Sequence, residues 1–116
     1  MPLYLIEEPI SIERLKEIAS ERFGDMVKVV VDIEKGAMVV GGELHADEES
    51  DLIGRGSMQE NLWGINLYPD ITGENWLEFD SMINVRPRQN NRTRGVEDPD
   101  IREKINRLVD QLVKRS

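Results

Sequence analysis

Two neighbouring stretches of alternating, β-branched sequence constrain the fold of this chain more than any other feature. Residues 26–34 and 37–45 each place apolar and polar side chains on opposite sides, which predicts two β-strands. The Lys-Gly pair that ends at Gly36 suits a two-residue turn, because glycine tolerates the positive φ that such turns need. Aligning Glu34 with Ala37 puts the larger apolar residues of both strands on one face, so we expect this register.

Two amphipathic helices are predicted outside the hairpin. Apolar residues recur with helical spacing over residues 12–23, and Ser11 is placed to cap the first turn. The same spacing recurs over residues 99–114, where Asp98 and Pro99 form a strong helix start. Each helix therefore has one apolar face that must be buried against another element.

Two further strands are expected between the hairpin and the last helix. Residues 61–68 and 76–86 alternate again, and pairing Leu67 with Leu77 aligns their apolar faces. The acidic connector that precedes them contains a possible short helical turn over residues 46–53.

Together these elements predict a single α+β domain over residues 1–116. It is a two-layer sandwich, in which a four-stranded, mainly antiparallel meander carries the N- and C-terminal helices on one face. Residues 3–6 add a short strand or an extended arm. On the open face, Lys28 would pair with Glu43. The other side chains predicted on this open face include Asp32, His45, Asn66, Tyr68, Trp76, Glu78, Asp80, Met82, Asn84 and Arg86.

Composition excludes several classes of function. The chain has 15 basic and 23 acidic residues and a net charge of −8, which argues against binding duplex DNA through a basic face. It has no cysteine, so disulfides, thiol catalysis and cysteine-ligated zinc are excluded. No apolar run approaches the ~20 residues needed to span a membrane. The N-terminus also lacks the basic start of a signal peptide, so we expect a cytoplasmic protein.

The segment 86–98 concentrates basic side chains in this acidic chain. Its guanidinium groups can hold phosphate or carboxylate in bidentate fashion, and its Asn-Asn pair can turn backbone N–H groups inward. The residues predicted to bind an anionic small molecule are Arg86, Arg88, Asn91, Arg92 and Arg94. The alternative is neutralisation, in which these arginines pair with the acidic run 43–51 or with a partner subunit. No phosphate-binding glycine motif occurs in the chain.

Four residues are candidates for catalysis. His45 is the only histidine, and Asp47 follows it closely. The carboxylate could orient His45 as a general base or join it as a metal ligand. The alternative is that His45 is a hydrogen-bonded structural residue. Glu78 and Asp80 would share one strand face, with Gly64 opposite Asp80 leaving open room above it. Such carboxylates either perform acid–base or Mg²⁺ chemistry or form the hydrated face of the sheet. No spacing is specific enough to predict a bound metal or a cofactor.

Four motifs resemble a family of short prokaryotic proteins of unknown function. They are Gly-Gly-Glu-Leu-His-Ala-Asp (41–47), Gly-Ser-Met-Gln (56–59), Leu-Trp-Gly-Ile-Asn-Leu-Tyr-Pro (62–69) and Ile-Asn-Val-Arg-Pro…Asn-Arg-Thr-Arg (83–94). The likeness covers nearly the whole chain and implies one intact domain. It implies no reaction, ligand or catalytic residue.

Two functional hypotheses remain. The favoured one is a small domain that binds an anion or phosphate, or that self-associates into a homo-oligomer through the open sheet face, because no motif fixes a nucleophile or a metal set. The alternative is a metal-assisted hydrolase of a phosphorylated or nucleotide substrate. In that case His45, Asp47, Glu78 and Asp80 would be the base or metal ligands, and the arginines would hold the phosphate. His45 and Asp80 would then have to share a cleft.

Overall fold

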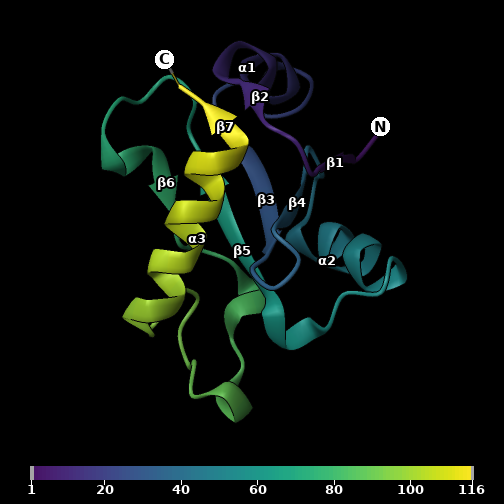
Figure 1. Ribbon diagram of the computed structural model, residues 1–116, viewed down its shortest axis with the longest axis vertical. Coiled ribbons are helices and arrows are strands. Elements are labelled where there is room, and N and C mark those ends of the chain that lie inside the picture. Colours follow the sequence, from purple (N-terminus) through teal and green to yellow (C-terminus); the bar gives the residue numbers. More distant parts are fainter. Residues whose placement is uncertain (1, 116) are drawn as a thin grey trace.

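The computed structural model describes residues 2–115. Seven strands lie in this range: β1 (Tyr4–Ile6), β2 (Ile10–Ser11), β3 (Val27–Asp32), β4 (Ala37–Val40), β5 (Leu62–Leu67), β6 (Leu77–Glu78) and β7 (Val113–Lys114). The α-helices of the same range are α1 (Ile12–Ser20), α2 (His45–Gly54) and α3 (Pro99–Leu112). The main sheet is antiparallel, with strand order β1-β4-β3-β5-β6, and β2 pairs with β7 in a small parallel sheet (Figure 1).

The predicted α+β class is confirmed, with both terminal helices on the same face of an antiparallel sheet. Leu15 and Ile18 of α1 and Ile105 and Val109 of α3 belong to one buried cluster with the β3, β4 and β5 side chains of that face. The small parallel sheet joins the start of α1 to the end of α3. Since β1 also pairs with β4, residues 4–6 are a strand rather than an arm, and the sheet has five strands instead of the four predicted.

Both predicted helix starts are confirmed. The Ser11 side chain accepts a hydrogen bond from the Arg14 N–H at 3.1 Å, and the Asp98 side chain accepts one from the Asp100 N–H at 2.8 Å. Helix α1 ends at Ser20, three residues earlier than expected. The possible turn at 46–53 is a full helix, α2.

The predicted hairpin register is wrong by two residues. Ala37 lies opposite Asp32 rather than Glu34. The cause is the Asp32 carboxylate, which accepts hydrogen bonds from the backbone N–H groups of Glu34 and Lys35, both at 2.9 Å, so that the chain turns earlier. A shift by two residues leaves every side chain on its expected face.

The sheet is not a simple meander. Strand β5 pairs with β3 instead of β4, so the partner of Lys28 is Asn66. The expected pair of Lys28 with Glu43 is absent from the structure of residues 2–115, because β4 ends at Val40 and Glu43 lies beyond its pairing with β3. Glu43 instead lies 3.8 Å from the Arg22 guanidinium.

Most of the predicted strand 76–86 is irregular. Its pairing of Leu67 with Leu77 is confirmed, but β6 ends at Glu78. Beyond that point the Asn84 side chain takes the place of a neighbouring strand for β5. Its amide accepts a hydrogen bond from the Gly64 N–H at 2.8 Å and donates one to the Gly64 carbonyl at 2.9 Å. Trp76 is buried in the main core and not on the polar face.

The second face of the sheet is half covered, which corrects the expectation of an open face. Leu52 of α2 packs there against Val30, Val39 and Leu62 in a second buried cluster. The part of this face that carries Lys28 lies outside that cluster. Across residues 2–115, no helix is long and apolar enough to cross a membrane.

Candidate functional site

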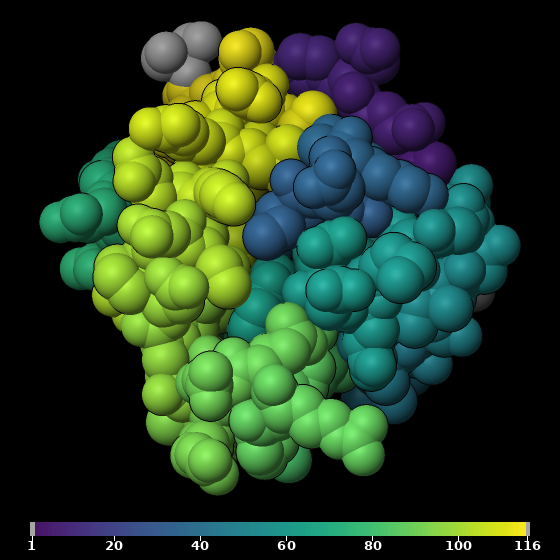
Figure 2. Space-filling view, turned by 60° about the horizontal axis from the view of Figure 1, so that its bottom comes forward, coloured from purple at the N-terminus to yellow at the C-terminus, as the bar shows by residue number. Residues whose placement is uncertain are grey.

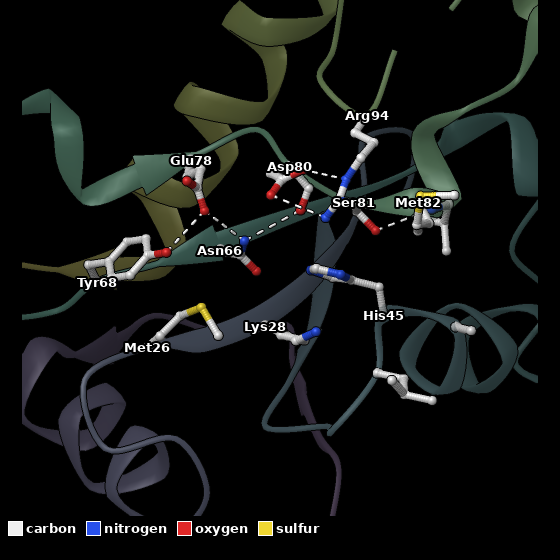
Figure 3. A pocket seen from close by; sticks show the side chains of 13 residues that line it. Met26, Lys28, His45, Asn66, Tyr68, Glu78, Asp80, Ser81, Met82 and Arg94 are labelled. Carbon is white, nitrogen blue, oxygen red and sulfur yellow. Dashed lines mark hydrogen bonds and ion pairs between the residues drawn. The ribbon is translucent and has the colours of Figure 1, made fainter. Parts of the chain in front are cut away.

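Three polar side chains form a row across the part of the sheet that α2 leaves uncovered. Lys28 of β3 lies opposite Asn66 of β5, and Asn66 lies opposite Glu78 of β6. All three side chains line the same cavity (Figure 3). Neighbouring strands are about 4.8 Å apart, so the Cα atoms of Lys28 and Glu78 are separated by roughly 10 Å.

The cavity above this row is a cleft of about 470 Å³. Its floor comes from β3 and β5, one wall from the segment after β6, and the other from the start of α2. Met26, Leu44 and Met82 add apolar surface. A cleft of this size falls within the ~300–1,000 Å³ typical of small-molecule sites.

Asn66 anchors the centre of the row. Its Nδ2 donates to Glu78 Oε1 at 2.9 Å, and the Tyr68 hydroxyl donates to the same oxygen at 3.0 Å. Burial and the hydrogen bond to Glu78 raise the pKa of Tyr68, which keeps its hydroxyl protonated. Asn66 is only 6% exposed, yet its Oδ1 has no hydrogen-bond partner among residues 2–115.

Two of the four charged groups that line the cleft neutralise each other. Arg94 donates to both oxygens of Asp80, with Nε at 2.7 Å and Nη2 at 3.3 Å. Lys28 is different, because its ammonium forms no ion pair or hydrogen bond with any residue that the structure describes. Its one recorded side-chain interaction is with the Phe23 ring, 5.6 Å from the ring centroid.

His45 begins α2 and reaches the same cleft. Its Nε2 lies 2.8 Å from the Ile65 carbonyl oxygen, which can only accept, so Nε2 carries the proton and Nδ1 is unprotonated in the neutral ring. Burial lowers the pKa of His45. The Ile65 carbonyl and the nearby Asn66 amide oppose this, although Asn66 Oδ1 forms no hydrogen bond with the ring. The imidazole is therefore neutral at physiological pH.

The four catalytic candidates are only partly brought together. His45, Glu78 and Asp80 line the cleft, so the shared cleft that the hydrolase hypothesis requires is present. Asp47 lies elsewhere, in a shallow hollow beside Arg22. Within residues 2–115, no three histidine or carboxylate side chains are grouped so that they could hold a metal ion.

The space expected above Gly64 is filled. A Cβ atom added at Gly64 would lie 2.5 Å from Ser81 Cβ. Asp80 therefore does not face an open glycine, and the glycine instead allows the segment after β6 to approach β5 closely.

Two of the predicted anion-binding residues are structural. Arg86 stacks on the Trp63 ring, with its guanidinium carbon 4.2 Å from the ring centroid, and donates to the backbone carbonyls of Gln59 and Leu62. Asn91 is buried, and its Nδ2 donates to backbone carbonyls of its own segment, including that of Gly95 at 2.8 Å. These contacts fix the shape of the segment.

The other arginines of this segment differ from one another. All three are exposed. Arg94 lines the cleft and pairs with Asp80, whereas the side chains of Arg88 and Arg92 form no ion pair among residues 2–115. Figure 2 shows this segment in light green on the surface beside α3. Within residues 2–115, no arginine of this segment forms an ion pair with the run 43–51. Arg94 pairs with Asp80 instead, while Glu43 pairs with Arg22 and Asp51 with Arg55.

Sequence reasoning placed Lys28 and Asn66 on the correct face but did not assign them to a site. The feature that identifies Lys28 and Asn66 as site residues is the row that they form with Glu78 across the sheet. This row depends on β5 lying next to β3, a pairing that alternation within each strand does not reveal.

Comparison with known proteins identifies the family of this chain. A family model described as "Protein of unknown function (DUF5674)" matches residues 4–112. The chain belongs to this family. The match confirms the expected resemblance to proteins of unknown function. No curated protein and no solved structure matches the chain. For this DUF5674 chain, function is therefore inferred from the chemistry of the cleft.

Proposed function

We propose that this DUF5674 chain binds a small molecule in the cleft and that Lys28 holds a negatively charged group of that molecule. The observation that carries the proposal is the Lys28 ammonium, a cation that faces the cleft without an ion-pair partner among residues 2–115. The chain around it has a net charge of −8, so an unpaired lysine inside a cleft is a specific local feature.

The physical basis is the electrostatic attraction between the Lys28 ammonium and a negatively charged group of the ligand. Two opposite unit charges 4 Å apart attract by about 4 kcal/mol at an effective dielectric constant of 20, before the cost of removing water is subtracted. Lys28 is half-buried, so water screens its charge less and it keeps more of this attraction than a fully exposed lysine would. Either a carboxylate or a phosphate satisfies this chemistry.

The test is a thermal-shift and calorimetry screen with acetate, succinate, inorganic phosphate and nucleotides. We expect at least one anion to bind, and Lys28→Met to weaken its binding at least tenfold. Lys104→Met is the matched control, because it removes the same charge from the exposed face of α3. Equal losses in the two variants, or no Lys28-dependent binding of any molecule that carries a negatively charged group, would contradict the proposal.

The same screen separates the cleft from the arginine-rich segment. A double variant, Arg88→Ala with Arg92→Ala, removes two exposed guanidinium groups of the segment 86–98 and leaves the residues that line the cleft unchanged. If the double variant loses the anion and Lys28→Met keeps it, the anion binds to the segment 86–98 and not to the cleft.

A second candidate is the metal-assisted hydrolase, and the observation in its favour is that His45 and Asp80 line one cleft. The neutral imidazole is in the correct form for a general base. The test is hydrolysis of phosphate esters and nucleotides with and without divalent cations. Activity that is lost in His45→Gln and Asp80→Asn, but kept in Asp47→Asn, would support it. Absence of turnover in the whole panel would refute it.

Self-association would use the part of the sheet face that α2 leaves uncovered. Leu44 and Met82 are 53% and 67% exposed at the mouth of the cleft, so a second copy of the chain would bury apolar surface there. Light scattering tests this idea. A dimer that Leu44→Ser with Met82→Ser disrupts would support it, and a monomer at high concentration would refute it.

A further inference from the structure

The cleft contains a second charge without a counterion. Glu78 forms no ion pair with residues 2–115, and its recorded hydrogen bonds, from Asn66 and Tyr68, both end on Oε1. Its Oε2 is therefore available to a ligand. Asp80 and Arg94 pair with each other. Among the described residues that line the cleft, this leaves Glu78 and Lys28 as two opposite charges without an ion-pair partner.

Asn66 lies between these two charges, and its buried Oδ1 has no hydrogen-bond partner among residues 2–115. Its Nδ2 is committed to Glu78, which fixes the orientation of the amide. The amide oxygen consequently points away from Glu78 and into the cleft, as Figure 3 shows. A buried carbonyl oxygen without a donor has a desolvation cost, and a ligand N–H group would remove that cost.

The charge balance of the cleft favours a ligand without net charge. Lys28 and Arg94 balance Glu78 and Asp80, and His45 is neutral. A simple anion would have to overcome the long-range repulsion of a protein with a net charge of −8 through its contact with Lys28 alone. A dipolar molecule satisfies Lys28 and Glu78 together and changes neither the charge of the cleft nor that of the protein.

We propose that the ligand is a zwitterion of the amino-acid or short-peptide class, with its carboxylate on Lys28 and its ammonium on Glu78 and Asn66 Oδ1. This inference rests on the proposed function and adds the cationic end of the ligand. An ammonium group carries three donors, which suits an arrangement of one carboxylate and one amide oxygen. Met26, Leu44 and Met82 provide an apolar surface for a side chain.

The experiment is calorimetry with leucine and leucylglycine, each compared with the same molecule lacking its amino group. For leucine the analogue is 4-methylpentanoate. We expect at least one zwitterion to bind ten or more times more tightly than its analogue. Glu78→Gln should remove this preference, whereas Lys28→Met should weaken the zwitterion and the analogue alike. Glu74→Gln, at another exposed carboxylate, is the control and should retain the preference.

The outcomes separate this inference from the proposed function. If the analogues bind as tightly as the zwitterions and depend on Lys28, the zwitterion inference is overturned and the anion proposal stands. If no probe in either panel shows binding that depends on Lys28, both are overturned. The comparison of ligands on the unmodified protein does not depend on how well any variant folds, and circular dichroism checks the fold of Glu78→Gln.

Discussion

The stability of this protein should depend on pH through Glu48, a fully buried carboxyl group on α2. Its Oε2 accepts a hydrogen bond from the Gly42 N–H at 2.9 Å, and its Oε1 has no partner among residues 2–115. Burial raises the pKa of Glu48 from 4.5 to about 9, against the smaller opposing effect of the Gly42 N–H. The folded protein therefore holds a proton on Glu48 at neutral pH.

The sign of the effect follows from proton linkage. The unfolded chain releases this proton above pH 4.5, whereas the folded chain keeps it until about pH 9. The contribution of Glu48 to stability is therefore intact below pH 4.5 and is lost as pH rises toward 9. One pKa unit corresponds to about 1.4 kcal/mol, so the loss is roughly 3 kcal/mol at pH 7.

Glu48→Gln tests this reasoning, because glutamine keeps an acceptor for Gly42 and has no proton to release. We expect the variant to match the natural protein near pH 5 and to be more stable by roughly 3 kcal/mol at pH 7, with a larger difference at pH 8. Urea unfolding at several pH values measures the difference. Glu49→Gln, on the same helix, is the control and should change stability by less than about 0.5 kcal/mol. A difference that does not grow with pH would refute the account.

Three other predictions concern the residues that shape the cleft. Gly64→Ala should destabilise the fold by about 1–3 kcal/mol in calorimetry, because its Cβ would overlap Ser81, and an unchanged melting temperature would contradict this. Asn84→Ala should cost roughly 2–4 kcal/mol, since the buried Gly64 N–H and carbonyl lose their partners; a loss below about 0.5 kcal/mol would show that water replaces the amide. In NMR, His45 should titrate below its ordinary pKa of 6.5, because burial disfavours the charged ring; its contribution to stability is then lost as pH falls through 6.5 toward the folded value, and a midpoint above 6.5 would be inconsistent with the buried site.

The elements that could be predicted from sequence are those specified by local patterns. Helices α1 and α3 follow from apolar spacing and from the caps Ser11 and Asp98, and alternation predicts β3 and β4. The hairpin register could not be predicted in the same way, because it depends on the Asp32 carboxylate binding two backbone N–H groups of the turn. Alternation gives the face of each residue but not its partner.

The segment after β6 shows a second limit of sequence reasoning. Residues 76–86 have the alternation of a strand, but Gly64 lacks a side chain and lets this segment fold inward. Asn84 then satisfies the backbone groups of Gly64 with its amide. The pattern of apolar residues does not indicate when a side chain, rather than a neighbouring strand, forms the hydrogen bonds of a strand's backbone.

The candidate site could be predicted only in its parts. Sequence reasoning assigned Lys28, Asn66 and Glu78 to one face, but their row exists because β5 lies next to β3. The arginine-rich segment 86–98 stands out in the sequence as a predicted anion-binding site, but several of its residues have other roles in the structure. Arg86 and Asn91 hold the backbone, and Arg94 neutralises Asp80.

The central claim, that the cleft is the ligand site, is tested most directly by an NMR titration of the ¹⁵N-labelled protein with the probe that binds most tightly in the two panels. The account predicts that the signals of the Asn66 side-chain amide and of the backbone at residues 26–28 move with the concentration of this probe, while those of residues 87–93 stay in place. Movement confined to residues 87–93, or no movement at all, would contradict it.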